Sequence, residues 1–182
     1  RASVSFDEII AGGPPKDGIP SIDDPVFVPV GEADRFEDRE PVIEIPLPGL
    51  EGRAYPLSVL MWHEIVNDTV AGQAVLVTYC PLCGTGIVFD RRVGDEVLEF
   101  GVSGMLWQSN LLMYNRTDDV ADESLWSQVL GEAVLGPFTR TRLNIVTSDT
   151  VRFGGWRTAH PDTTVLTRDT GESRNYDRDP YG

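Results

Sequence analysis

The sequence predicts a single α+β domain in which two or more short helices pack on a mostly antiparallel β-sheet. Short apolar runs recur along the chain, and turns rich in Gly, Asn and Asp join them without crossover helices. With 182 residues and a hydrophobic share of 41%, the chain is long enough to bury one sizeable core. No segment is long and polar enough to act as a linker, so residues 1–182 are predicted to form one domain.

Residues 1–54 are predicted to form an extended arm, rich in Pro and Gly, that wraps a core of residues 55–170. Turn-forming clusters interrupt this segment, among them residues 12–15 and 46–49. Two apolar pieces between the turns, residues 26–28 and 42–45, are predicted to be short edge strands.

The clearest predicted helix covers residues 55–68, because apolar side chains from Leu57 to Ile65 recur there at helical spacing. A second short helix is predicted over residues 151–160, with Pro161 beyond its end. Alternating or β-branched residues predict strands at 75–79, 87–90, 96–102, 110–115, 142–147 and 163–167. Residues 125–134 stay open between strand and loop.

The two cysteines, Cys80 and Cys83, are predicted to lie at the tip of a β-hairpin. Strand-forming residues precede Cys80, and Gly84 and Gly86 let the chain reverse into a second strand. A thioredoxin-like CxxC instead opens a helix, whose N-terminal N–H groups lower the pKa of the first thiol. A CxxC on a turn flanked by glycines resembles a metal knuckle, in which both thiolates point the same way.

The predicted metal ligands are Cys80, Cys83 and His63. Cu(I) accepts two or three soft ligands, whereas zinc usually takes four, so copper is the first expectation and zinc the second. The apolar stripe of the 55–68 helix is expected to cover the sheet face from which the hairpin tip projects, which would turn His63 toward the sulfurs. A redox-active dithiol and a pair of inert, buried thiols stay open as alternatives.

Ser103 and Asn110 are the predicted lining of a small-molecule pocket, because neighbouring small residues allow a ligand to approach the backbone closely. Turn chemistry between strands is the alternative interpretation. If such a pocket adjoins the thiols, the protein is a metal- or dithiol-dependent oxidoreductase that acts on a small molecule. If not, it stores or carries metal. No nucleotide-binding, protease or hydrolase motif occurs that would name a reaction.

The charge balance narrows the choice of partners. With 29 acidic against 15 basic residues the net charge is -14, which repels nucleic acid and anionic membranes. No apolar run approaches the roughly 18 residues of a membrane span. The metal ion expected at the cysteines and the small molecule expected at Ser103 and Asn110 are left as the predicted partners.

Several strings resemble the DUF3179 family of bacterial and archaeal proteins. They are WHEIVND at 62–68, YCPLCGTG at 79–86, FGVSG at 100–104, NLLMY at 110–114, SLWSQ at 124–128, HPDT at 160–163 and DPY at 179–181. The family name records an unknown function, but the resemblance implies that Cys80, Cys83 and His63 are the positions most suggestive of chemistry. Members often resemble exported or lipid-anchored proteins. This implies an exported or cell-surface location, with the signal segment outside a sequence that begins at Arg1.

Overall fold

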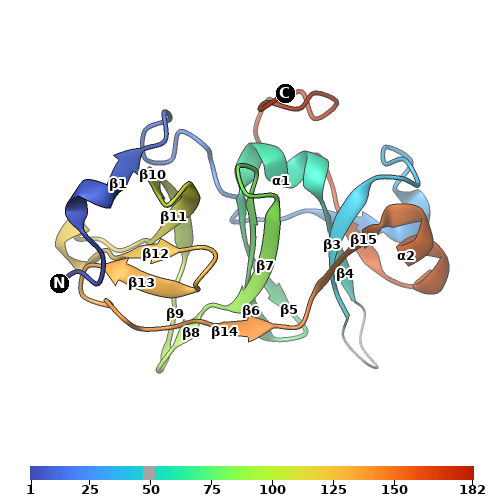
Figure 1. Cartoon of the computed structure of the whole chain (residues 1–182). Coiled ribbons are helices and arrows are strands. Elements are labelled where there is room, and N and C mark those ends of the chain that lie inside the picture. The colour runs from blue at the N-terminus through green and yellow to red at the C-terminus, as the bar shows by residue number, and fades with distance from the viewer. Residues whose placement is uncertain (47–51) are drawn as a thin grey trace.

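The computed structural model describes residues 1–46 and 52–182, and in this part of the chain three larger β-sheets lie side by side (Figure 1). The first sheet has the order β1 (Ile9–Ala11), β10 (Phe100–Trp107), β11 (Asn110–Asn115), β12 (Leu125–Ser127) and β13 (Glu132–Leu135). The central sheet has the order β14 (Asn144–Val146), β7 (Thr85–Asp90), β6 (Gln73–Cys80) and β5 (Ile65–Val70). The third sheet has the order β15 (Asp149–Arg152), β3 (Pro41–Ile45), β4 (Arg53–Pro56), β16 (Thr164–Leu166) and β2 (Phe27–Pro29).

Smaller elements complete the described structure. They are the helices α1 (Leu57–His63) and α2 (Phe153–Ala159), the ribbon β8 (Arg92–Val93) and β9 (Glu96–Val97), and 3-10 turns at Phe6–Glu8, Val30–Glu32 and Val120–Asp122. Strand pairs are antiparallel throughout the three sheets except for β16 on β4, which is parallel. The predicted α+β class, with mostly antiparallel sheet and two short helices, is confirmed.

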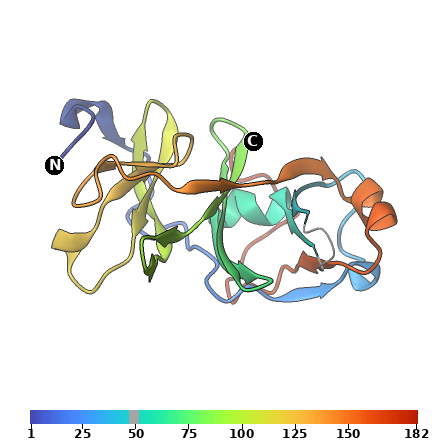
Figure 2. The same cartoon turned by 90° about the horizontal axis from the view of Figure 1, so that it is seen from below.

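The central sheet is covered on both faces, which explains the nearly continuous apolar run of β6. Successive side chains of a strand point to opposite faces. Val75 and Val77 therefore enter a core shared with the third sheet, whereas Leu76 and Cys80 enter a second core shared with the first sheet. Figure 2 shows the central strands between the two outer sheets. The β6–β7 hairpin thus belongs to two cores at once.

The predicted helix at 55–68 is too long. Helix α1 ends at His63, and Glu64 then takes a left-handed backbone conformation with φ of 59°. Residues from Ile65 onward form β5 and pair with β6 in a regular antiparallel register. Ile65 and Val66 are β-branched and gain a full ladder of hydrogen bonds in the strand, so pairing with β6 prevails over continuation of the helical stripe.

The other predicted elements lie close to observed ones. Strands at 75–79, 87–90, 110–115, 142–147 and 163–167 and the helix at 151–160 each overlap an observed element of the same type. The strand predicted at 96–102 divides between β9 and the start of β10, because residues 98–99 leave the ladder. The open segment 125–134 contains β12 and most of β13.

The segment predicted as a wrapping arm divides into two parts. In its first part β1 adds to the first sheet beside β10. Its second part supplies β2, β3 and β4 to the third sheet, where Val42 and Ile45 are buried. Strand β2 lies at an edge as predicted, but β3 lies between β15 and β4 and is not an edge strand. The turn predicted at 46–49 lies almost wholly outside the described residues.

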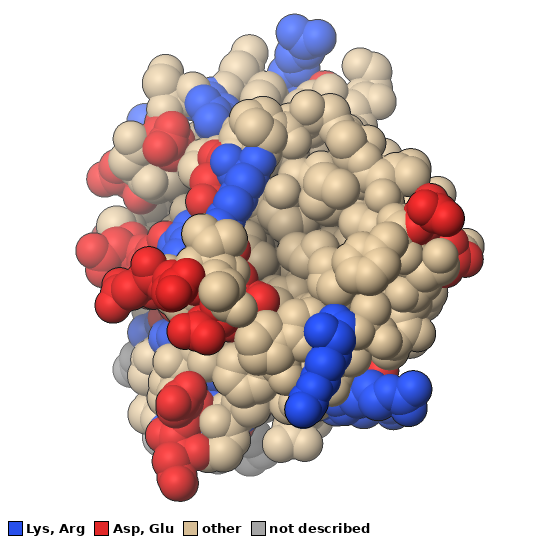
Figure 3. Space-filling view, turned by 90° about the vertical axis from the view of Figure 1, so that its left-hand side faces the viewer, with Lys and Arg blue, Asp and Glu red and all other residues tan. Residues whose placement is uncertain are grey.

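Charge is distributed unevenly over the surface. Figure 3 views the end of the molecule formed by the first sheet, where acidic side chains gather along one margin and most of the centre carries no charge. Among the described residues, neither helix combines the length and apolar character that a membrane crossing requires.

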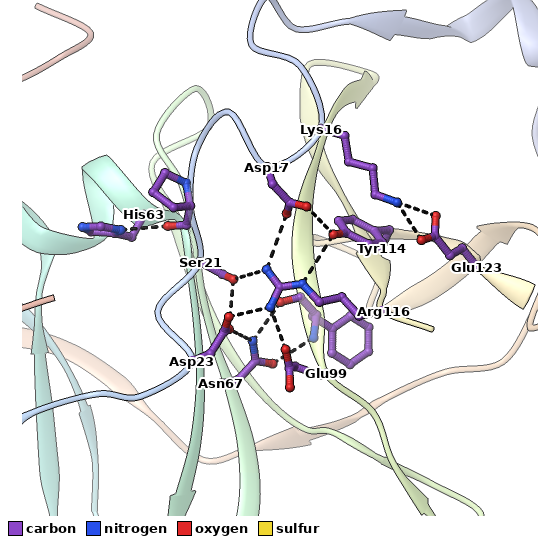
Figure 4. Close-up of polar contacts among 12 residues, drawn as sticks. Lys16, Asp17, Ser21, Asp23, His63, Asn67, Glu99, Tyr114, Arg116 and Glu123 are labelled. Atoms are coloured by element: carbon purple, nitrogen blue, oxygen red, sulfur yellow. Dashed lines mark hydrogen bonds and ion pairs between the residues drawn. The ribbon is translucent and has the colours of Figure 1, made fainter. Parts of the chain in front are cut away.

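Arg116 anchors the arm to the rest of the molecule (Figure 4). Its guanidinium group contacts the carboxylates of Asp17 and Asp23 in the arm and, at 2.6 Å, that of Glu99. Asn67 on β5 also donates to Asp23, at 2.7 Å. One arginine thus fastens residues 17–23 across the first and central sheets through charge-assisted hydrogen bonds.

Candidate functional site

The sulfur atoms of Cys80 and Cys83 lie 2.7 Å apart at the tip of the β6–β7 hairpin. Cys80 ends β6 and is buried, whereas Cys83 lies in the turn and is exposed. The turn is closed by the Cys83 N–H, which donates to the Cys80 carbonyl at 3.2 Å. The predicted hairpin is therefore present, and its tip holds two neighbouring sulfurs of which one is open to solvent.

A second hairpin tip meets the first at this point. Strands β10 and β11 are joined by Gln108 and Ser109, which both have positive φ, as a tight two-residue hairpin turn requires. The turn places Asn110 against the cysteines, so that its Nδ2 atom donates to the Cys83 sulfur at 3.3 Å. The Cys83 thiol in turn donates to the Ser109 carbonyl at 3.6 Å. Asn110, predicted as a ligand-binding residue, thus contacts the thiol site directly.

Gln128 joins the two hairpin tips through a buried hydrogen-bond network. Its side-chain oxygen accepts from Asn110 at 3.0 Å and from Thr85 at 3.1 Å. Its side-chain nitrogen donates to the Thr78 hydroxyl and to the Thr85 carbonyl. Because Gln128 is fully buried and uses both ends of its amide, the network orients Asn110 toward the sulfur.

The environment of the two sulfurs acts on the pKa of Cys80 in both directions. Burial raises the pKa of the Cys80 thiol to about 11, and its contact with the Cys83 thiol adds to that rise. The nearby backbone N–H groups of Leu111 and Cys83 lower the same pKa, while the side chain of Asn110 donates a hydrogen bond to Cys83. These donors can stabilise negative charge on sulfur once a proton has been displaced.

His63 does not turn toward the cysteines. Its Nδ1 atom lies 2.7 Å from the carbonyl oxygen of Pro20, and its Nε2 atom lies 2.7 Å from the Tyr176 hydroxyl (Figure 4 shows the contact with the arm). A carbonyl can only accept, so Nδ1 carries the proton and Nε2 accepts from the tyrosine. The described residues contain no group of three His, Cys, Asp or Glu side chains placed to share a metal. The prediction places His63 beside the sulfurs, whereas its two ring nitrogens contact Pro20 of the arm and Tyr176 near the C-terminus.

Three consecutive residues at the end of α1 contact the C-terminal tail, which is residues 167–182 after β16. Each makes one hydrogen bond to it: Trp62 Nε1 to the Arg178 carbonyl at 3.1 Å, His63 Nε2 to Tyr176 at 2.7 Å, and Glu64 Oε1 to the Tyr181 hydroxyl at 2.8 Å. Figures 1 and 2 both show the tail ending beside the β6–β7 hairpin. Burial and the neighbouring Glu64 carboxyl raise the pKa of Tyr181 at the end of this tail.

Glu64 makes stability depend on pH. Burial raises its pKa from 4.5 to about 7, and the hydrogen bond from Tyr181 offsets only part of this rise. The folded state therefore binds more protons than the unfolded state between these pH values, and its stability falls as the pH rises from 4.5 to 7. We expect Glu64→Gln, which keeps an acceptor for Tyr181, to remove this fall and to gain up to roughly 3 kcal/mol on the parent at pH 8.

Urea denaturation of both proteins at pH 4.5 and pH 8 measures this difference. Burial lowers the pKa of His63, but His63 is present in both proteins and its effect cancels in the comparison. Parallel pH profiles for the parent and the Glu64→Gln variant would show that the buried carboxyl does not bind the extra proton.

The Ser103 side chain forms hydrogen bonds with backbone groups of the β10–β11 hairpin. Its hydroxyl donates to the Leu112 carbonyl and accepts from the Met105 N–H at 3.1 Å. Between Val102 and Met105 the β10–β11 register shifts, so the Ser103 side chain satisfies backbone groups at this irregularity. Both of its hydrogen bonds are made to the surrounding strands, unlike those of Asn110.

Comparison with protein families supports the resemblance found in the sequence. A family model described as a protein of unknown function, DUF3179, matches residues 16–182. The chain belongs to the DUF3179 family. The match includes both cysteines, the Trp62–Glu64 segment and the tail, and it begins next to Asp17 of the arm. No curated protein and no solved structure matches the chain significantly.

Sequence reasoning missed three residues that the structure places near the thiols. Gln128 organises the network behind Asn110, and the buried carboxyl of Glu64 accepts a hydrogen bond from the exposed Tyr181 beside the hairpin tip. The sequence offered one signal for Gln128, which is its polar side chain two residues after the apolar pair Leu125 and Trp126. Nothing local indicates the Glu64–Tyr181 pair, since 117 residues separate the two.

Proposed function

We propose that this DUF3179 protein binds a soft metal ion, Cu(I) in preference to zinc, through the thiolates of Cys80 and Cys83. The observation that supports the proposal is the pair of adjacent sulfurs at one hairpin tip, where the side-chain N–H of Asn110 donates to Cys83 and nearby backbone N–H groups lower the pKa of Cys80. Donors around ligating atoms orient them and stabilise their negative charge in metal sites. A pair of inert core thiols has no need of them.

The ligand set favours copper over zinc. Two thiolates complete a two-coordinate Cu(I) site, whereas a tetrahedral zinc ion requires two further ligands. Both cysteines project from one hairpin tip, and Cys83 is exposed, so a bound ion is open to exchange with a partner molecule. This arrangement suits carriage or transfer of copper better than a closed structural site.

We expect reduced protein to take up one Cu(I) per chain in competition with a chromophoric Cu(I) chelator under anaerobic conditions. The Cys80→Ser and Cys83→Ser double variant should bind none at the same chelator concentration, because a hydroxyl is a poor ligand for a soft ion. Affinity should rise with pH, since binding requires both thiols to lose their protons. A parallel titration with zinc tests the order of preference.

Two control variants sharpen this test. Leu82→Ala changes an exposed side chain between the two cysteines and should retain one copper. His63→Gln should also retain it, because Pro20 and Tyr176 occupy both ring nitrogens of His63. One copper held tightly by the double cysteine variant would end the proposal.

A dithiol–disulfide oxidoreductase is the second candidate, favoured by the short separation of the sulfurs. At 2.7 Å they lie closer than two ligands of one metal ion usually do, and a disulfide bond is about 2.05 Å long. In such a reaction the two thiols would lose two electrons and two protons to an acceptor disulfide and form their own S–S bond. Equilibration with graded ratios of reduced and oxidised glutathione, followed by thiol titration, measures whether the pair cycles within the cellular range.

A further inference from the structure

A cavity of about 660 Å³ lies between helix α1, the segment around residues 35–41 and the C-terminal tail. Its wall includes Ser58 and Met61 of the helix and residues 176–179 of the tail. Neither cysteine nor Asn110 is part of this wall, so the cavity is separate from the thiol site. Its volume lies in the range of cavities that bind small molecules.

Four arginines line this cavity in a chain whose net charge is -14. They are Arg35, Arg39, Arg168 and Arg178, and they come from segments more than 100 residues apart. Only 15 basic residues occur in the whole sequence, so this wall is a local concentration of arginine, beside four carboxylates of the same wall. Arg35 and Arg168 also line an adjoining cavity of about 490 Å³, which makes them common to both spaces.

The carboxylates in the same wall are already engaged. Glu37 pairs with Arg39 at 2.6 Å, and Asp177 pairs with Arg168 at 2.7 Å. The remaining two each accept a backbone N–H: Glu40 from Ser58 at 2.9 Å and Asp179 from Tyr181 at 2.8 Å. The acidic groups are thus matched by donors within the protein.

Several hydrogen-bond donors of this wall have no partner in the described part of the chain. Within the described part of the chain, the side chains of Arg35 and Arg178 make no hydrogen bond or ion pair. Two buried atoms of the wall, Ser58 Oγ and Arg168 Nε, also have no partner among the described residues. Buried donors without acceptors are uncommon, and the arginine nitrogens can only donate. The donors that a ligand in the cavity can reach are the exposed guanidinium groups of Arg35 and Arg178, which have no partner among the described residues.

Arg168 is held in place before any ligand arrives. Its guanidinium group lies 5.4 Å from the centre of the Phe36 ring and is tied to Asp177 on its other side. A guanidinium group fixed in this way loses little side-chain entropy when it binds a second acceptor, and its planar fork matches the oxygens of carboxylate and phosphate.

We propose that this cavity binds a small molecule that carries a phosphate or carboxylate group, with Arg35, Arg168 and Arg178 as the residues that recognise it. The shared chemistry is an anionic group with two or more oxygens, which arginine can contact in a bidentate manner. The site is independent of the thiol site and of the metal proposal. Ligand binding would also fasten the tail, because Arg178 belongs to it.

The test is isothermal titration calorimetry of the parent protein with inorganic phosphate and, separately, with malonate, with sodium chloride added to keep ionic strength constant. We expect one site per chain for at least one of the two anions, and the tighter of them identifies the preferred group. The double variant Arg35→Gln and Arg178→Gln should weaken binding at least tenfold. It should fold normally, because neither side chain has a partner within the described structure.

An exposed arginine outside the cavity gives the matched control. Arg152→Gln, on β15, removes one positive charge of the same kind, where the double variant removes two, and should leave the affinity unchanged. Failure of both anions to bind the parent, or equal weakening by Arg152→Gln, would overturn the proposal. Because none of these variants alters a cysteine, a negative result here leaves the copper titration unaffected.

Discussion

Replacing Asp68 with alanine is expected to lower the free energy of unfolding by about 3 kcal/mol. The Asp68 carboxylate accepts from Arg53 at 2.6 Å and from the Tyr55 hydroxyl at 2.7 Å, and it is only 6% exposed. Without it, the Tyr55 hydroxyl is buried with no acceptor and the Arg53 charge loses its partner. Arg53 retains some contact with solvent, so the loss falls at the lower end of the range for broken buried pairs.

Urea denaturation followed by tryptophan fluorescence measures this loss. Asp68→Asn should cost less than Asp68→Ala, because the amide oxygen still accepts from Tyr55 while the charge for Arg53 is gone. Asp118→Ala, which removes an exposed carboxylate, is the matched control and should change stability by less than about 0.5 kcal/mol. A loss below about 1 kcal/mol for Asp68→Ala would show that the three side chains do not form a stabilising unit.

Trp126→Ala is expected to cost about 3–5 kcal/mol, the range for removal of a fully buried aromatic side chain. Trp126 has no exposed surface and packs edge-on against Phe100, with ring centres 5.6 Å apart. Its indole N–H also donates to the buried side-chain oxygen of Asn115 at 3.0 Å. The substitution would therefore leave a cavity in the core between the first and central sheets.

The same denaturation experiment tests a consequence of the two-core architecture. Asp68 lies beside one core and Trp126 in the other, yet β6 supplies side chains to both. Each variant should therefore unfold in one transition at lower urea, without a separate early phase. Trp107→Ala, at a partly exposed position, should cost less than Trp126→Ala. Two resolved transitions in either variant would show that the sheets unfold independently.

Local sequence was enough to place the two cysteines of the predicted site. The position of His63 depends on contacts with residues far away in the chain. Gly84, Gly86 and the β-branched strands around them are local signals, and they were enough to predict the hairpin tip that brings the two sulfurs together. His63 lacked such a signal. Its partners Pro20 and Tyr176 are 43 and 113 residues away, and only the folded chain shows that they take both ring nitrogens.

The sequence by itself determined the α+β class, the antiparallel hairpins and the position of the CxxC, because turn chemistry and strand alternation act over a few residues. Tertiary structure decided the rest. Ile65–Val70 forms a strand because it pairs with β6 through backbone hydrogen bonds. Strand β16 forms a parallel pair with β4, from which it is separated by more than 100 residues. Asn110 contacts Cys83 because two hairpin tips meet. Four arginines line one cavity because the arm, helix α1 and the tail surround it. Contacts between segments so far apart carry no periodic signal in the chain, since packing alone brings them together.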